Sequence, residues 1–518
     1  MQKNLTLKLL PHEAADENII RQYLAAASGK KEKAISGFNI LRRSIDARGK
    51  HPWINLTIDV FIDEPFQKRQ WVIFHFQNVH QAKRQVLIIG AGPAGLFAAL
   101  KLLEAGIKPV ILERGKDVRS RRRDLAVLNK EGIINPESNY CFGEGGAGTY
   151  SDGKLYTRSS KRGDVTRILN LFVHFGADEN ILADAHPHIG TNKLPHIISA
   201  IRKQIMDCGG EILFEKKMTD LVIENERVVR VKTADGNFFS GEAVILATGH
   251  SARDIFHLLR EKMIAIEFKP FALGVRVEHP QSLIDNIQYH CLSRGKFLPP
   301  ASYSLVKQTT GGAIFSFCMC PGGIIAPAST NAGELVVNGW SPSKRNNPFA
   351  NSGIVTPIDE SNLQAFKKLG PLAGLYFQQQ VEQKAFAAGG GKFVAPAQRL
   401  IDFCENKVSS NLPLCSYLPG VHSASLNEVL PEFVYKNLKD AFKEFGKKMN
   451  GYYTNEAVVV ATESRTSSPV RIPRNTDTLN HPQIKNLYPC GEGGGYAGGI
   501  VSAAMDGEKI ASLVITHH

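Results

Sequence analysis

A glycine-rich turn between an apolar strand and a helix constrains the fold of this chain more than any other feature. The apolar run at residues 86–89 is typical of a buried strand in a parallel sheet, and residues 94–103 have the pattern of a helix. Between them, Gly90, Gly92 and Gly95 follow the order Gly-x-Gly-x-x-Gly. A strand, this turn and a helix in succession predict a dinucleotide-binding unit.

Each glycine of this turn has its own physical role. Gly90 permits the tight turn, Gly92 lets a pyrophosphate approach the backbone, and Gly95 allows the helix to pack closely on the strand. Pro93 and Ala94 lie where the helix begins, and a helix N-terminus favours phosphate charge. We therefore predict that all five residues bind the cofactor or support its site.

An acidic residue ends the next predicted strand, at residues 109–112. Glu113 follows Gly90 by 23 residues, close to the spacing of about 20 expected for the acid that binds a ribose hydroxyl. Arg114 comes next, and a dense arginine cluster that includes Arg122 follows soon after. We include both arginines among the cofactor-binding candidates, although a surface role for the cluster is an equally good interpretation.

Composition places the chain among ordinary globular proteins. It has 518 residues, 43% hydrophobic and 21% charged, which is enough for two or three domains with a large core. Eight scattered cysteines without a framework spacing indicate a reducing compartment, so we expect a cytoplasmic location. No apolar leader and no run of membrane-spanning length is visible, so no membrane partner is expected.

Two later segments favour a flavin over a nicotinamide as the bound dinucleotide. Residues 244–249 combine an apolar strand with a small-residue turn, and residues 486–500 form a glycine-rich stretch before a predicted helix at 501–513. A helix N-terminus there would stabilise the negative charge of a reduced flavin. The residues expected to contact FAD in these segments are Thr248, Gly249, Gly491, Glu492, Gly498, Gly499 and Ile500.

Together the three segments resemble the FAD fingerprints of the glutathione-reductase-type flavoprotein superfamily. In that superfamily the first unit binds the ADP half, and a Gly-Glu or Gly-Asp turn, here Gly491-Glu492, holds the ribitol-phosphate side. Over essentially the whole chain, longer strings are similar to the bacterial family of uncharacterised FAD-dependent dehydrogenases. These strings are residues 139–155, 186–195, 317–323 and 463–474. The resemblance implies FAD and redox chemistry and leaves the substrate open.

The predicted fold class is α/β, with a Rossmann-like FAD-binding domain built from two discontinuous segments, 81–260 and 471–518. Residues 261–470 are rich in short strands and Pro/Gly turns, which predicts a mixed α+β substrate domain. Residues 1–80 predict a small N-terminal α+β domain in the order β-α-β-β. A ferredoxin-like arrangement is one interpretation of that order.

A loop with five glycines between residues 143 and 153 is a further candidate for cofactor contact. Glycines let a loop lie against a flat ring or a phosphate, although a simple tight connection has the same composition. We expect flavin contact here. The predicted cofactor-binding residues of this loop are Gly145, Gly146, Ser151, Asp152 and Lys154, and Met218 at the start of an antiparallel meander completes the set.

Two groups of polar residues keep more than one interpretation. His186 and His188 have no partner cysteine or acid at ligand spacing, so no metal site is expected, and a turn or cleft position is favoured. Arg465, Arg471 and Arg474 precede the last glycine segment. They are predicted either to form structural ion pairs or to anchor an anionic substrate.

Disulfide reductases of this superfamily carry two redox cysteines with either four or two residues between them. The cysteines of this chain show neither spacing. Cys318 and Cys320 are separated by one residue, a spacing that strains an internal disulfide. Small buried thiols are the default interpretation of such residues. A thiol-redox role for this pair stays open.

No second Gly-x-Gly-x-x-Gly follows a strand, so one dinucleotide site is expected. We predict an FAD-dependent oxidoreductase, a dehydrogenase or reductase, that transfers a hydride at flavin N5 to or from a small, conceivably anionic substrate. One alternative is an FAD monooxygenase reduced by transiently docked NAD(P)H. Another, motivated by a net charge of +13, is a flavin-dependent RNA-associated or RNA-modifying protein. The basic residues form no single tract, so nucleic acid is not a favoured partner. The sequence identifies no catalytic acid or base and no oligomeric state.

Overall fold

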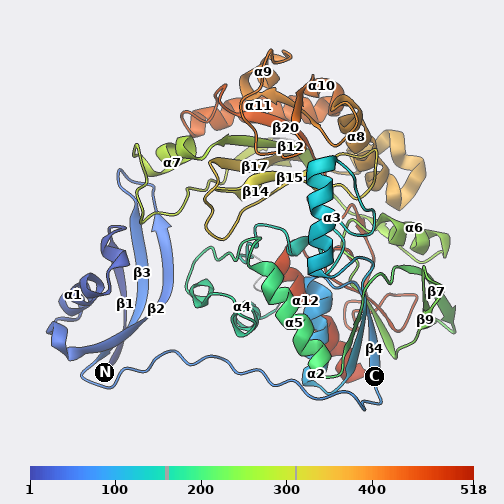
Figure 1. Ribbon diagram of the computed structural model, residues 1–518, viewed down its shortest axis with the longest axis horizontal. Helices are drawn as coiled ribbons and strands as arrows, with labels where there is room; N and C mark the ends of the chain where they lie inside the picture. Colours follow the sequence, from blue (N-terminus) through green and yellow to red (C-terminus); the bar gives the residue numbers. More distant parts are fainter. Residues whose placement is uncertain (158–162, 310–311, 518) are drawn as a thin grey trace.

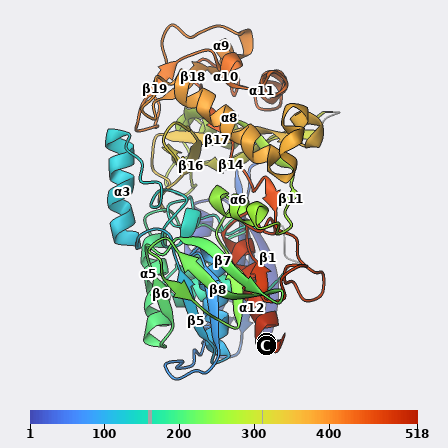
Figure 2. The same cartoon turned by 90° about the vertical axis from the view of Figure 1, so that its right-hand side faces the viewer.

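Three regions are visible in the computed structural model, which describes residues 1–157, 163–309 and 312–517. Figure 1 shows a small N-terminal unit on the left, joined by a long extended segment to a parallel sheet with helices on the right. Figures 1 and 2 both show a second sheet with its helices above the parallel one. The candidate site lies where the two larger regions meet.

The five-stranded parallel sheet confirms the predicted α/β fold class. Its strand order is β22-β10-β4-β5-β6, and every neighbouring pair is parallel. The strands are β22 (Leu487–Pro489), β10 (Ala243–Leu246), β4 (Gln85–Ile89), β5 (Lys108–Leu112) and β6 (Glu211–Leu213). Because all strands point the same way, the glycine turn, Glu113 and the late glycine segment lie at one edge, beyond the carboxyl ends of the strands.

Both faces of this sheet are covered, which explains why β4 is a continuous apolar run. Val86 and Ile88 face one side, where they pack in a core with helices, and Leu87 and Ile89 face the other. The helices on the first side are α2 (Pro93–Glu104), α4 (Val165–His174), α5 (Leu194–Asp207) and α12 (Ile500–His517). The second side carries α6 (Arg253–Glu261) and the predicted meander, β7 (Met218–Glu224), β8 (Arg227–Thr233) and β9 (Phe238–Phe239).

The second large sheet has seven strands in the order β13-β14-β17-β12-β20-β18-β19. All pairs are antiparallel except β18 with β19. The strands are β12 (Phe271–Pro280), β13 (Val306–Thr309), β14 (Gly312–Cys320), β17 (Phe349–Ile358), β18 (Ala395–Arg399), β19 (Val421–Ser423) and β20 (Val458–Glu463). Two short pairs accompany it, β11 (Glu267–Phe268) with β21 (Val470–Arg471) and β15 (Ile324–Pro327) with β16 (Val337–Trp340).

Helices α7 (Gln281–Tyr289), α8 (Ala373–Ala388), α9 (Leu400–Glu405), α10 (Leu426–Val429) and α11 (Glu432–Lys448) pack on this sheet, as Figure 2 shows for α8 to α11. Helix α11 has the predicted amphipathic pattern. Val434, Leu438 and Phe442 are buried in the core, whereas Lys436 and Lys443 are exposed. The lysines of this helix therefore form a solvated face over an apolar stripe.

The N-terminal unit consists of β1 (Gln2–Leu9), α1 (Glu17–Ser28), β2 (Ile35–Asp46) and β3 (Trp53–Ile62), in the predicted order. The sheet order is β1-β3-β2, with both pairs antiparallel. Helix α1 begins at Glu17 because the side chain of Asp16 accepts hydrogen bonds from the N–H groups of Asn18 and Ile19. A ferredoxin-like unit would add a helix and a strand, and the described residues 63–84 contain neither.

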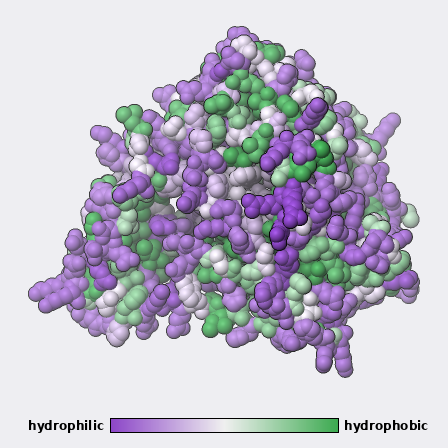
Figure 3. Space-filling model, in the orientation of Figure 1, coloured by the Kyte–Doolittle hydropathy of each residue, from purple (hydrophilic) through white to green (hydrophobic). Residues whose placement is uncertain are grey.

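Helix α3 (Val118–Glu131) stands beside the parallel sheet and carries the arginine cluster. In Figure 3 a strongly hydrophilic patch lies over this helix on the face turned to the viewer. Among the described residues, no helix combines the length and the apolar character that crossing a membrane requires.

Candidate FAD site

A cavity of about 380 Å³ extends from the carboxyl edge of the parallel sheet to strand β14 of the second sheet. Its walls come from segments that are far apart in the sequence, including the glycine turn after β4, the loop after β10 and the start of α12. Its volume is in the range of ligand pockets. The lower sheet therefore supplies one wall of the cavity and the upper sheet supplies the other.

The glycine turn after β4 has the geometry that its spacing predicts. Gly90 has a φ of 106°, and an added Cβ would lie 2.4 Å from the carbonyl oxygen of Ala247. A Cβ at Gly95 would lie 2.0 Å from the carbonyl oxygen of Gly90, so only glycine permits this packing of helix on strand. A Cβ at Gly92 would meet only Gly146, at 3.9 Å. Gly92 therefore leaves open space on the cavity side at the N-terminus of α2, where backbone N–H groups are free to bind phosphate.

Glu113 lines the cavity and organises the backbone around it. Its buried carboxylate accepts hydrogen bonds from the N–H groups of Ala91, at 2.8 Å, Gly115, at 2.8 Å, and Gly143, at 3.0 Å. These bonds fix the glycine turn and the five-glycine loop relative to β5. A carboxylate has room for about four acceptor interactions, so capacity for a ribose hydroxyl remains.

Arg114 lies next to Glu113 in a network of ion pairs. Its guanidinium is 4.0 Å from the ring centroid of Phe142 and contacts Glu137 at 2.7 Å and Asp254 at 2.9 Å. Lys217 contacts the same two acids. Burial lowers the pKa of Arg114, but the two acids raise it above its usual value, so the guanidinium stays charged. At this end of the cavity the charges of Arg114 and Lys217 are therefore matched by the two acids.

The five-glycine loop packs directly on the glycine turn. The N–H of Gly145 donates to the carbonyl of Ala91 at 2.8 Å, and a Cβ at Gly146 would lie 3.1 Å from the Cα of Gly92. Gly148 lies beside Ile500, the first residue of α12, because a Cβ there would be 3.2 Å from the Cγ1 of Ile500. The loop thus connects the N-termini of α2 and α12 along one wall.

The late glycine segment contributes a second helix N-terminus. Gly498 and Gly499 have open space at their Cα atoms, and both line the cavity just before α12 begins. The N–H of Gly491 donates to Asp506 at 2.7 Å, while the carboxylate of Glu492 faces the cavity and lies 3.3 Å from Nδ1 of His250. Open glycine backbone, two helix N-termini and an acid at the strand edge fit the phosphates and ribose of FAD.

Most of the predicted cofactor-binding residues line one cavity. They are Gly90, Gly92, Pro93, Ala94, Glu113, Arg114, Gly146, Ser151, Asp152, Lys154, Met218, Thr248, Gly249, Glu492, Gly498, Gly499 and Ile500. Gly95, Gly145 and Gly491 do not line it and instead support the turns around it. Arg122, also predicted to bind the cofactor, is exposed on α3 and lies outside the lining of this cavity.

One arginine of the cluster, Arg121, is held by backbone contacts, whereas Arg119 and Arg123 are exposed. Arg121 is fully buried, and each of its three nitrogens donates to a backbone carbonyl group, of Asn139, Tyr140 or Glu144. Its position is explained by helix phase, because α3 turns Arg121 inward and its neighbours outward.

Two of the three late arginines, Arg465 and Arg474, form ion pairs within the protein, which was one of their two predicted roles. Arg474 contacts Asp506 at 2.6 Å. Arg465 contacts Glu382 at 2.9 Å and Glu334 at 3.2 Å, and it also lines the cavity. Arg471 is exposed. The charge of Arg465, the late arginine that lines the cavity, is therefore already matched by buried acids.

The sequence did not indicate that Lys154 and the Cys318–Cys320 pair meet. The Nζ of Lys154 is 3.6 Å from the sulfur of Cys318 and 3.7 Å from that of Cys320, across more than 160 residues. Asp152, nearly fully buried, contacts Lys154 at 3.7 Å and Arg345 at 2.9 Å. Burial lowers the pKa of Lys154, but the two sulfurs and Asp152 raise it above its usual value, so the amine remains protonated.

A smaller chamber of about 90 Å³ adjoins this end of the cavity. The two spaces share Cys141, Ala147, Ser151, His250, Cys318, Asn338 and Arg465 as lining residues. The remaining walls of the chamber are largely aromatic and aliphatic and include Tyr140, Val336 and Trp340. A small apolar group thus has a place beside the thiol of Cys318.

His186 and His188 lie at a different opening, a cavity of about 1430 Å³ between the N-terminal unit and the second sheet. Nε2 of His188 contacts the carbonyl oxygen of Ser343 at 3.2 Å, and burial lowers the pKa of His188 to about 4. Both histidines therefore face a cleft, which was one of the two predicted positions.

Three family models match this chain. An FAD binding domain matches residues 83–130, a model described as "FAD-dependent protein, C-terminal domain-like" matches residues 270–466, and a domain of unknown function matches residues 1–61. The first match covers β4, the glycine turn, α2, β5 and Glu113. The second covers most of the seven-stranded sheet, including both cysteines of β14.

Relatives were found among proteins and solved structures. A protein named "Uncharacterized protein" from Clostridium beijerinckii is 36% identical over 518 residues, covering 96% of each chain. Thiamine thiazole synthase from Aeropyrum pernix is 25% identical over 185 residues, covering 33% of this chain and 56% of that protein. Tetracycline destructase Tet(51) has a TM-score of 0.35 at 11% identity, covering 84% and 82% of the two chains. A glycine oxidase from Bacillus cereus has a TM-score of 0.31 at 14% identity, covering 84% and 96%. At TM-scores and identities this low, these two structures support no inference about the function of this chain.

The sheet, the glycine turn and the matched FAD domain define an FAD-binding oxidoreductase. The chain belongs to one family with its Clostridium beijerinckii relative, a family of FAD-dependent proteins.

Proposed function

We propose that the protein is a dehydrogenase or reductase of small substrates, related to the glutathione-reductase-type flavoproteins, with one dinucleotide site. Bound FAD would supply the hydride acceptor or donor at its flavin ring. The observation that carries this proposal is the 90 Å³ chamber, which shares its lining with the end of the FAD cavity at Cys318. A substrate in this chamber would lie next to the cofactor site on a fixed protein surface.

The residues of the chamber have distinct tasks in this proposal. The N-terminus of α12 faces the cavity and favours negative charge on a reduced cofactor. Tyr140, Val336 and Trp340 exclude water from the chamber and orient an apolar part of the substrate. Arg465 is held by two glutamates, which fixes its position and leaves little net charge for an anion. We therefore favour a substrate that is neutral where it enters the chamber.

The large cleft beside the N-terminal unit bears on the RNA-associated alternative. Its lining is basic, but Arg43 contacts Asp184, Arg294 contacts Asp285 and Arg345 contacts Asp152. Because these charges are matched locally, the cleft does not strengthen that alternative.

The test is an anaerobic absorbance spectrum of the purified protein before and after NADH and then NADPH. Bleaching of a flavin spectrum by either nucleotide would support a pyridine-nucleotide-driven reductase, and oxygen consumption after air is admitted, with one oxygen atom incorporated into a substrate, would distinguish a monooxygenase. A flavin that stays oxidised would indicate a substrate-driven dehydrogenase. If the protein holds no flavin even after FAD is added, the proposed function is wrong.

A further inference from the structure

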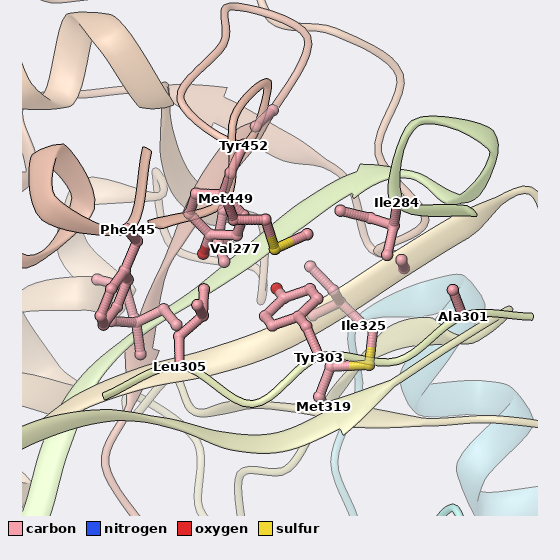
Figure 4. Close-up of a cluster of buried hydrophobic side chains, with 14 of the residues drawn as sticks. Val277, Ile284, Ala301, Tyr303, Leu305, Met319, Ile325, Phe445, Met449 and Tyr452 are labelled. Carbon is pink, nitrogen blue, oxygen red and sulfur yellow. The ribbon is translucent and has the colours of Figure 1, made fainter. Parts of the chain in front are cut away.

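Strand β14 brings two thiols together beside the FAD cavity, which Cys318 lines. Its register with β17 shifts between Phe317 and Cys320, and Cys318 has a φ of 44° in the left-handed region, which is uncommon for a residue with a side chain. Met319 points the opposite way, into the hydrophobic cluster with Tyr303 and Ile325 that Figure 4 shows. The local distortion leaves the sulfurs of Cys318 and Cys320 4.0 Å apart.

The surroundings of the two thiols differ from those of the other cysteines. The ammonium of Lys154 contacts both sulfurs, and the carbonyl oxygen of Cys318 accepts from Cys320 at 3.2 Å and from Arg276 at 3.3 Å. Arg276 is itself paired with Glu463 at 2.6 Å. Elsewhere, Cys404 packs in the core, and burial raises its pKa to about 12.

These contacts shift the pKa values of the two thiols in opposite directions. The contact with the sulfur of Cys320 and the charge of Lys154 lower the pKa of Cys318 well below its usual value, although burial opposes the shift. The same contact and burial raise the pKa of Cys320. The charged groups facing the pair are Lys154, Asp152, Arg276 and Glu463, so the cationic groups adjoin Cys318 directly and the acids lie behind them.

We propose that Cys318 and Cys320 are a redox-active dithiol that reduces small disulfide substrates, with Cys318 as the nucleophile and Cys320 as the resolving thiol. The proposal rests on the proposed function for the source of electrons and names its substrate class. Cys318 lines both the cavity and the 90 Å³ chamber, so a small disulfide has a place to bind next to its sulfur.

The exchange balances in two steps. The Cys318 thiolate attacks one sulfur of the substrate R–S–S–R, forming a mixed disulfide and releasing RS⁻, which takes the proton of Cys320. The Cys320 thiolate then attacks the sulfur of Cys318, forming the Cys318–Cys320 disulfide and releasing a second RS⁻, which takes a proton from solvent. Bound FAD, once reduced by a nicotinamide or another hydride donor, would supply the two electrons and one proton that return the pair to the Cys318 thiolate and the Cys320 thiol.

The one-residue spacing favours the step that returns the pair to the dithiol, so an excess of the disulfide substrate must drive the opposite step. A disulfide between residues separated by one position is strained, and strained disulfides are readily reduced. Such a bond is poorly suited to holding the fold together. Lys154 acts as a positioning and charge-stabilising residue for the Cys318 thiolate.

The test uses the full-length protein as purified, mixed anaerobically with 2-hydroxyethyl disulfide and quenched with an alkylating reagent. Peptide mass mapping is expected to show a Cys318–Cys320 disulfide and release of two thiols per chain. Cys320→Ser is expected to accumulate a mixed disulfide on Cys318, and Cys318→Ser is expected to form neither product. Lys154→Met is expected to raise the pH midpoint of Cys318 alkylation by iodoacetamide and to slow it about tenfold at pH 7.

Two controls keep the outcomes distinct. Cys291, half-buried like Cys318 but outside the cavity, is the internal reference for alkylation, and Cys291→Ser should behave like the unaltered chain. Flavin absorbance and the melting temperature of each variant report the integrity of the site. A folded, flavin-loaded protein in which Cys318 reacts no faster than Cys291, or in which Cys320→Ser traps no mixed disulfide, overturns the proposal. Exchange at Cys318 in a protein that binds no flavin would support the dithiol and contradict the proposed function.

Discussion

Gly507 of α12 packs against Ala94 of α2 so closely that a Cβ at position 507 would lie 2.1 Å from the carbonyl oxygen of Ala94. Ala94 is in the first turn of α2, and it lines the FAD cavity. The N-terminus of α12 lines the same cavity. The absence of a side chain at Gly507 therefore sets the distance between two helices that both present N-termini to the cofactor site.

Gly507→Ala should separate these helices and loosen the site. Overpacking a close contact of this kind costs roughly 1–3 kcal/mol, and the affinity for FAD should fall because the two N-termini move apart. Urea unfolding of the apoprotein and a fluorescence titration with FAD measure the two effects. Lys509→Ala, on an exposed position of the same helix, should change stability by less than about 0.5 kcal/mol. Equal results for both variants would contradict the packing argument.

Gly92→Glu should abolish FAD retention without unfolding the protein. The added side chain would enter open space on the cavity side, where it meets only Gly146 at 3.9 Å, and its carboxylate would repel the pyrophosphate. Flavin absorbance after purification and circular dichroism test the prediction. Gly49→Glu, at an exposed glycine with no atom near its Cβ, is the matched control. Normal flavin content in Gly92→Glu would show that the pyrophosphate lies elsewhere.

Glu113→Gln should weaken both the fold around the cavity and FAD binding. The amide places a donor where the carboxylate now accepts from Ala91, Gly115 or Gly143, so at least one buried N–H loses its partner. An unsatisfied buried group costs about 1–3 kcal/mol. Thermal melts and FAD dissociation constants would detect the change. Glu261→Gln, at an exposed residue, should be neutral, and a neutral Glu113→Gln would argue that these bonds carry little energy.

His279 should make part of the stability depend on pH. It is fully buried, its Nε2 contacts the carbonyl oxygen of Tyr452 at 2.9 Å, and burial lowers its pKa to about 4. The unfolded chain binds a proton near pH 6.5, so this contribution is present above pH 6.5 and is lost as the pH falls toward 4.

The measurement compares the native chain with His279→Gln by urea unfolding at pH 7 and pH 5. At about 1.4 kcal/mol per pH unit below 6.5, the native chain should lose roughly 2 kcal/mol more than the variant. Burial raises the pKa of the neighbouring Glu278 to about 7, but this group is common to both proteins and cancels in the comparison. A stability difference that does not change with pH would contradict the prediction.

Local patterns predicted the nucleotide-binding core well. Strand β10 ends at Leu246, within the predicted strand-and-turn segment 244–249, and β4, α2 and β5 differ from prediction by one residue at their ends, because their apolar periods and glycine breaks are local. The role of Gly95 followed from spacing alone. Such signals need no knowledge of which distant segments meet.

The contacts that the sequence did not predict all depend on distant segments or on helix phase. Lys154 reaches Cys318 across the interface between the two large regions, and the distortion of β14 at Cys318 has no sequence signature. Arg121 and Arg122 are neighbours, yet one is buried against backbone carbonyls and the other is exposed. A run of charges does not show which member faces inward until the helix is placed.

The pairing of α2 with α12 also has a consequence for how the protein is made. Roughly 400 residues separate the two helices, and at about 5–20 residues per second their synthesis is about 20 to 80 seconds apart. During that interval α2 lies beside the nascent sheet without the helix that covers it, and its apolar surface is open to aggregation. Cofactor loading must follow synthesis, and a ribosome that stalls before residue 500 releases a chain that cannot complete the site.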